Sequence, residues 1–290
     1  MSAQLAKLKR IAIFLATIFS ASISGMVHAD WSIKGLGTLG GADSYAYGIN
    51  DSGQVVGYSS LAGDYPRDSH AFLTGPNGIG ITDLGTLGGR ESLATAINDS
   101  GQVVGWSDTA SGSSHAFITG PNGIGMTDLG TLGGSFSKAT GINDSGQVVG
   151  DNFFGADRHA FITGPNGKGM TELGTLGGET SEAHGINDSG EVVGQSTTAT
   201  GEIHSFVFSH GGITDLSLLA PVVAAGWTNL NALSINNDGQ IAGGGQHYGN
   251  SEAFLLSFTT VVPEPETYLM LLGGLGLVGY LAWRRKEMAI

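Results

Sequence analysis

One sequence unit is written five times along the chain, and this repetition limits the fold more than any other feature. Each unit opens with the phrase Ile-Asn-Asp-Ser-Gly-Gln-Val-Val-Gly, which changes at one position in the fourth copy and at several in the fifth. The copies begin at Ile49, Ile97, Ile142, Ile186 and Ile235, 44 to 49 residues apart. A period of this length predicts an array of equivalent modules that bury their apolar faces against one another.

Two shorter phrases follow the same period. His-Ala-Phe begins at His70, His115 and His159 and returns in changed form at His204 and Glu252. Gly-Thr-Leu-Gly-Gly begins at Gly37, Gly85, Gly130 and Gly174. Together the phrases resemble the HAF-repeat family of extracellular proteins over nearly all of residues 31–258. The resemblance implies export and little about activity, and we treat residues 30–258 as one domain of five repeats.

Each unit predicts four short strands. In the first unit we expect them at residues 44–50, 54–59, 70–74 and 81–84, with turns at 51–53 and 76–78. Asn, Asp, Ser, Pro and Gly in the two turn segments favour this interpretation. Four strands in about 45 residues match the blade of a β-propeller.

The phase of the repeats bears on how the array ends. Residues 31–41 resemble the fourth strand of a unit, whereas the fifth unit stops after its third strand, at residues 254–256. A ring closed by pairing the N-terminal strand into the last blade would use both ends and remove exposed sheet edges. We therefore predict an all-β five-bladed propeller closed in this way, with an open β-solenoid as the alternative.

The first 29 residues have the features of a secretory signal. Lys7, Lys9 and Arg10 precede an apolar stretch over residues 11–26, and cleavage is expected after Ala29. A retained N-terminal membrane helix is the alternative.

The other end, residues 259–290, has three parts in order. Pro263-Glu264-Pro265 is followed by an apolar run over 268–283, where we expect a transmembrane helix, and then by Arg284-Arg285-Lys286 as the membrane stop. These parts resemble the PEP-CTERM sorting signal of Gram-negative, often biofilm-forming bacteria. The resemblance implies processing by an exosortase-type enzyme and a place at the cell surface or in the extracellular matrix. An ordinary tail anchor is the alternative.

Composition excludes several functions for the repeats. Residues 31–262 contain six basic and 21 acidic side chains, so their surface repels nucleic acid. The chain has no cysteine, so neither disulfides nor a thiol nucleophile is available. No catalytic motif or phosphate-binding glycine loop is present, and we expect no catalytic residues, no metal and no cofactor.

Two repeated elements invite a metal-binding interpretation. The Asn-Asp-Ser-Gly element lacks the alternating acids of a calcium loop, so we interpret it as a structural turn, with a metal site shared between copies as the alternative. A metal ring could use the residues that open the second phrase, namely His70, His115, His159, His204 and Glu252. We expect instead that the Phe of this phrase packs between blades and the His lies at the edge of that core.

The repeats differ mainly between their second and third strands, at residues 61–69, 109–114, 152–158, 197–203 and 247–251. A constant frame with variable loops is typical of a binding surface. Aromatic residues that could stack on sugars lie in or near these loops: Tyr58, Trp106, Phe153, Phe154, Trp227 and Tyr248. The sequence thus predicts a non-enzymatic surface or biofilm-matrix protein that binds extracellular polysaccharide or a surface partner. A carbohydrate-active hydrolase or lyase and a purely structural matrix component are the alternatives.

Overall fold

The computed structural model describes residues 32–63 and 68–257. The expected signal segment with Ala29 and the sorting segment with Pro263-Glu264-Pro265 and Arg284-Arg285-Lys286 lie outside these ranges. The chain divides into two units, residues 1–35 and 36–290. In the first unit, the described residues 32–35 contain no strand or helix. Within the described ranges, no helix has the length and apolar character needed to cross a membrane.

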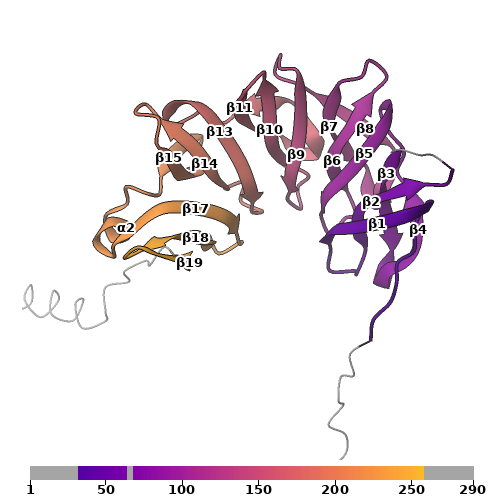
Figure 1. The fold of residues 1–290 in the computed structure, drawn as a ribbon, viewed down its shortest axis with the longest axis horizontal. Helices are drawn as coiled ribbons and strands as arrows, with labels where there is room; N and C mark the ends of the chain where they lie inside the picture. The colour runs from indigo at the N-terminus through magenta and orange to yellow at the C-terminus, as the bar shows by residue number, and fades with distance from the viewer. Residues whose placement is uncertain (1–31, 64–67, 258–290) are drawn as a thin grey trace, which may run out of the picture. The chain divides into compact units, whose positions relative to one another are not determined.

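The second unit contains five antiparallel sheets, each made of strands that are consecutive in the chain (Figure 1). The first sheet consists of β1 (Gly40–Ile49), β2 (Val55–Leu61), β3 (Ser69–Gly75) and β4 (Ile79–Asp83). The second consists of β5 (Gly88–Ile97), β6 (Val103–Thr109), β7 (Ser114–Thr119) and β8 (Met126–Gly130). The third consists of β9 (Phe136–Ile142), β10 (Val148–Phe154), β11 (Asp157–Thr163) and β12 (Met170–Glu172).

The last two sheets complete the array. The fourth consists of β13 (Gly177–Ile186), β14 (Val192–Thr198), β15 (Ile203–Ser209) and β16 (Gly212–Asp215). The fifth consists of β17 (Trp227–Ile235), β18 (Ile241–His247) and β19 (Asn250–Leu256), and α2 (Ala220–Ala224) precedes it. Short 3-10 turns follow the third strands of the first three sheets, at η1 (Pro76–Gly78), η2 (Pro121–Gly123) and η3 (Pro165–Gly167). The architecture is all-β and propeller-like, as the repeats predict.

The four-strand reading of each unit is confirmed in the first four repeats. The expected strands of the first repeat overlap β1 to β4, with ends that differ by a few residues. The Pro-Asn-Gly turn depends on Asn77, whose φ of 54° lies in a region that Asn tolerates better than most residues. Residues 152–158 are different from the prediction: most of this segment belongs to β10 and β11, which meet in a short turn.

The predicted closing strand is not formed in the described residues. The fifth sheet has three strands, and residues 32–38 contain none. In the first three sheets, a Pro-Asn-Gly turn folds the fourth strand back on the third, so the pairing is local. Closure by the N-terminal segment would instead join residues about 200 positions apart, and it must offset a larger loop-closure entropy.

The core lies between neighbouring sheets. Phe117 of the second sheet packs with Val56 and Ala71 of the first, and all three are fully buried. The same contact recurs with Phe161 and Phe206 in the next two interfaces. The expectation that the repeated Phe packs between blades is therefore confirmed.

A ladder of hydrogen bonds joins each Ile-Asn-Asp turn to the next one. The Asn98 side-chain nitrogen donates to the Gln102 side chain of its own turn at 2.9 Å and to the Asn143 carbonyl of the next turn at 3.0 Å. Its oxygen accepts hydrogen bonds from Ser100 and from the Gln102 backbone. The backbone N–H of Asp99 also donates to the Asp144 carboxylate at 3.1 Å. The turns are therefore structural, as predicted, and they also fasten one sheet to the next.

We expect Asn98→Ala to lower the free energy of unfolding by about 3 kcal/mol, because it leaves several buried polar groups without partners. Asn236→Ala is the matched control. Asn236 is exposed and makes similar bonds within its own turn, to Gln240 and to the backbone N–H of Asp238. Among the described residues, its side chain donates no hydrogen bond to another sheet. We expect it to cost only about 1 kcal/mol. Urea unfolding of the two variants measures the difference, and equal losses would contradict a role for the Asn side chain between sheets.

Candidate functional site

The histidines of the second phrase form pairs with acids on the fourth strands. His70 Nδ1 lies 2.9 Å from the Asp83 carboxylate, and His204 Nδ1 lies 2.6 Å from that of Asp215. Equivalent pairs join His115 to Asp128 and His159 to Glu172. The partners of these four histidines are therefore side-chain carboxylates.

The fifth repeat exchanges the two roles of this pair. Glu252 takes the place of the histidine, and His247 of the preceding strand supplies the imidazole at 3.0 Å. The carboxylates also hold the following turn, since Asp83 accepts the Gly85 backbone N–H at 2.7 Å. Among the described residues, no group of three or more His, Asp or Glu side chains is placed to hold a metal ion. The pairs fasten the third strand to the fourth in the first four sheets, and the second strand to the third in the fifth sheet.

The five Ile-Asn-Asp turns line one pocket of about 350 Å³. Three of its four acids are already used by the ladder: the carboxylates of Asp99, Asp144 and Asp188 each accept the backbone N–H of the preceding turn. In the fifth turn, Asn237 takes this place. The pocket is thus explained by the contacts that join the repeats.

A larger groove lies between the first and second sheets. Its volume is about 440 Å³, and it combines aromatic and acidic side chains. The lining residues are Asp43, Tyr45, Tyr47, Tyr58, Ser60, Asp68, Ser69, Glu91, Leu93 and Trp106. We call it the aromatic groove. Apolar walls with a few polar groups are typical of small-molecule and saccharide sites.

Three tyrosines form the floor of the groove. Tyr45 and Tyr58 face each other across β1 and β2, with ring centroids 5.1 Å apart and planes inclined by 22°. Tyr47 also stacks on Tyr58, with ring centroids 6.0 Å apart and planes inclined by 25°. Tyr45 and Tyr47 are more than half exposed, so their faces are available to a ligand. Burial, followed by the neighbouring tyrosines and Asp43, raises the pKa of Tyr58, which therefore stays neutral at physiological pH.

Two acids border the tyrosine floor without partners of their own. Among the described residues, no side chain donates a hydrogen bond to the carboxylate of Asp43 or Glu91, and neither acid forms an ion pair. A third acid, Asp68, is paired with Arg90 at 2.7 Å. The groove therefore holds two acidic side chains that are open to a ligand.

One position of the second strand distinguishes the repeats from each other. The residue after Val-Val-Gly is Tyr58 in the first sheet and Trp106 in the second, but Asp151 in the third and Gln195 in the fourth. In the fifth repeat, Gly244 has this place. We did not single out Asp151 from the sequence. An alignment of the repeats at Val-Val-Gly reveals it, because the third repeat has a carboxylate at the position where the first two repeats have an aromatic residue.

Asp151 is a buried carboxylate in a cluster of charges. It is 8% exposed, and its Oδ1 accepts the Ala183 backbone N–H of the fourth sheet at 3.0 Å. Burial raises the pKa of Asp151 to about 7; Glu182 adds to the rise, whereas the Ala183 N–H, Arg158 and Lys138 oppose it. Arg158 is bound to Glu182 at 2.9 Å. Strongly perturbed acids are often found at functional sites.

Lys138 links this charged cluster to the aromatic groove. Its ammonium lies 5.5 Å from the centre of the Trp106 ring and 5.9 Å from that of Phe153. Phe153 stacks on Phe136 with centroids 4.2 Å apart. The cation–π contacts hold the Trp106 side chain at the end of the groove.

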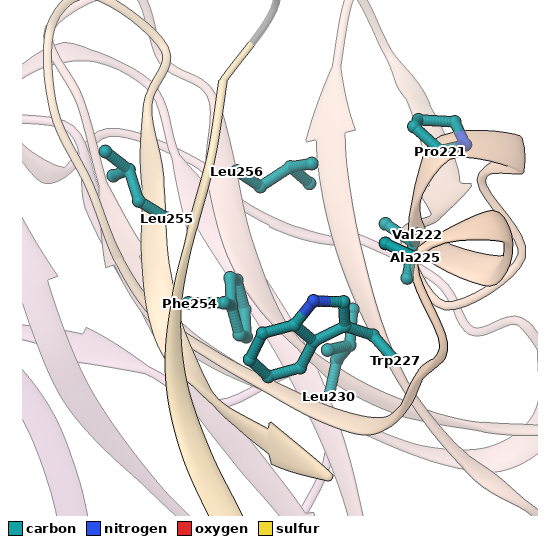
Figure 2. Close-up of a pocket in the computed structure, with 8 residues that line it drawn as sticks. All are labelled: Pro221, Val222, Ala225, Trp227, Leu230, Phe254, Leu255 and Leu256. Atoms are coloured by element: carbon teal, nitrogen blue, oxygen red, sulfur yellow. The ribbon is translucent and has the colours of Figure 1, made fainter. Parts of the chain in front are cut away.

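The remaining predicted aromatics lie elsewhere. Trp227 stacks on His247 and lines a second, smaller pocket of about 190 Å³ at the fifth sheet. Figure 2 shows its walls: side chains from α2 and from β17 and β19, all apolar or aromatic. This pocket offers little hydrogen bonding to a sugar. Of the six aromatics predicted from the sequence, only Tyr58 and Trp106 line the aromatic groove, which also uses Tyr45 and Tyr47.

Comparisons with known proteins concern the sorting segment and the fold. Residues 261–286 match the family model of the PEP-CTERM protein-sorting motif. The chain therefore carries the signal that an exosortase recognises, which implies an exported protein with sorting-dependent membrane association in Gram-negative bacteria. No curated protein matches the chain. The HAF-repeat identity remains a prediction.

Three solved structures share low similarity with the chain. A Mycobacterium tuberculosis puromycin-hydrolyzing peptidase is 13% identical with a TM-score of 0.43, covering 69% of this chain and 34% of the peptidase, about a third of its length. The gluconolactonase XC5397 from Xanthomonas campestris is 10% identical with a TM-score of 0.40, covering 76% and 78%. A chain of the nidogen/laminin complex is 9% identical with a TM-score of 0.44, covering 73% and 80%.

We expect the stability of the protein to fall as the pH rises from about 4 to about 7, because native Asp151 retains its proton over this range and the unfolded chain does not. Asp151→Asn keeps a side-chain oxygen that can accept the Ala183 backbone N–H. It also removes the free-energy cost of ionising a buried carboxyl group. It should raise the melting temperature at pH 8 and leave it nearly unchanged at pH 4. Asp157→Asn on the same sheet controls for loss of one charge. An equal effect of Asp151→Asn at both pH values would contradict this assignment.

Proposed function

We propose that the chain is a non-enzymatic surface or matrix protein that binds extracellular polysaccharide in the aromatic groove. The observation that carries the proposal is the stacked floor of Tyr45, Tyr47 and Tyr58, since exposed aromatic faces pack against the C–H faces of sugar rings. Asp43 and Glu91 beside it would accept hydrogen bonds from sugar hydroxyls. The sorting signal supports this role because it takes the repeats to where such polymers are found.

The membrane connection in this proposal comes from the C-terminal segment. The transmembrane helix expected at residues 268–283 would hold the repeats at the membrane until an exosortase acts on the sorting motif. Processing would then leave the repeats at the cell surface or in a biofilm matrix. A surface protein as partner is compatible with the same groove.

A carbohydrate-active hydrolase is the second candidate, and Asp151 is the observation that favours it. An acid that is half protonated at neutral pH can act as a general acid, and Glu182 could serve as the second carboxylate. Two features weigh against this role: Asp151 is buried, and Arg158 engages Glu182. Release of reducing ends from a polysaccharide, abolished by Asp151→Asn, would establish the enzyme.

We expect the full-length protein, purified in detergent, to bind saturably to glycans on an array. Tyr58→Ala removes the centre of the aromatic floor and should weaken binding about tenfold, which corresponds to about 1.4 kcal/mol. Tyr248→Ala is the matched control, because Tyr248 is exposed and belongs to the fifth sheet. Circular dichroism checks that both variants fold. Equal loss in both variants, or no saturable glycan, would contradict the proposed function.

A further inference from the structure

We infer that the aromatic groove selects saccharides with free amino groups, namely polymers of de-N-acetylated hexosamine. This inference rests on the proposed function and adds the chemical class of its ligand. It follows from the combination of exposed tyrosine faces with two unpaired carboxylates in one groove of about 440 Å³. An amino sugar carries both complementary features, a C–H face and a cationic ammonium group.

The carboxylates are placed for this task by the strand geometry. Asp43, Tyr45 and Tyr47 all belong to β1 and all line the groove. The backbone N–H of Asp43 donates to the Ser60 hydroxyl of β2 at 3.0 Å, which fixes this end of β1 beside the strand that carries Tyr58. Across the groove, Glu91 is the residue of the second repeat equivalent to Asp43. A sugar stacked on the exposed face of Tyr45 or Tyr47 would therefore lie in a groove that has a carboxylate on each of its two sheets.

These acids belong to the first two repeats only. The equivalent positions are Phe136, Thr180 and Asn229 in the third, fourth and fifth repeats. Neither acid has a structural partner among the described residues, unlike the acids that pair with histidines or accept backbone N–H groups. The acids thus coincide with the aromatic floor and have no evident role in holding the fold.

The charge of the groove separates the possible ligands. Arg90, a basic residue at the edge of the groove, forms an ion pair with Asp68. The negative charges of Asp43 and Glu91 are therefore not compensated by this arginine. Residues 31–262 as a whole have 15 more acidic than basic side chains. An anionic polymer such as a polyuronate would be repelled by the acids of the groove and by the net negative charge of the repeats, whereas a polycation would be attracted. A neutral N-acetylated polymer would gain the stacking contact but no ion pair.

The test compares two probes of equal length, the hexamers of glucosamine and of N-acetylglucosamine, by calorimetry with the full-length protein in detergent at pH 5.5. Asp and Glu are ionised at this pH, and the amines are protonated. We expect the glucosamine hexamer to bind at least tenfold more tightly. The double variant Asp43→Asn/Glu91→Gln should remove this preference, because it weakens binding of the glucosamine hexamer at least tenfold more than binding of the N-acetylated hexamer. Raising the salt concentration should weaken binding of the glucosamine hexamer only, because salt screens ion pairs.

A double variant elsewhere controls for the general acidity of the surface. Glu179→Gln/Asp238→Asn removes the same charge from exposed positions in the fourth and fifth repeats. If this control weakens glucosamine binding as much as the groove variant does, the attraction is non-specific and the inference fails. Equal affinity for the two hexamers overturns the inference but leaves the proposed function intact. If neither hexamer binds while another glycan binds and requires Tyr58, the inference fails alone; if no glycan binds, both fail.

Discussion

The side-chain amide of Asn in each Ile-Asn-Asp turn is the contact on which the rest of the structure depends. It closes its own turn and donates to the carbonyl of the next turn, at 3.0 to 3.1 Å in all four junctions between sheets. Because every junction uses the same bond, neighbouring sheets pack with the same register. Equivalent residues of successive repeats therefore line adjacent walls, and a groove between two sheets is formed by matching positions.

This regularity explains how a repeated scaffold can carry one distinct site. The buried residues, such as Phe117 and Ala116, hardly change from repeat to repeat because the interfaces are equivalent. The residue after Val-Val-Gly, in contrast, differs from one repeat to the next. Tyrosine and tryptophan at that position in the first two repeats make an aromatic groove, whereas Asp151 in the third makes a charged cluster. The site thus arises from a difference between repeats on a common frame.

The sequence alone predicts the local features and misses those that depend on neighbouring repeats. The strands and turns follow from residue preferences within each unit, and the burial of Phe follows from alternation along a strand. The bond from Asn98 to Asn143 joins residues 45 positions apart, so no local pattern reveals it. Tyr45, Asp43 and Glu91 do not stand out in the sequence, because the repeats vary most in their loops, whereas the groove is lined mainly by strand residues. The closing strand was predicted from repeat phase, which carries no information on the entropy of a long closure.

The most direct test of the account is a crystal structure of the protein with a bound glucosamine oligomer. We predict a sugar ring stacked on the exposed face of Tyr45 or Tyr47, with an ammonium group within hydrogen-bonding distance of Asp43 or Glu91. Trp106 should close one end of the groove, held by Lys138 as in the free protein. An oligomer bound at the apolar pocket beside Trp227, or in the pocket of the Ile-Asn-Asp turns, would contradict the central claim.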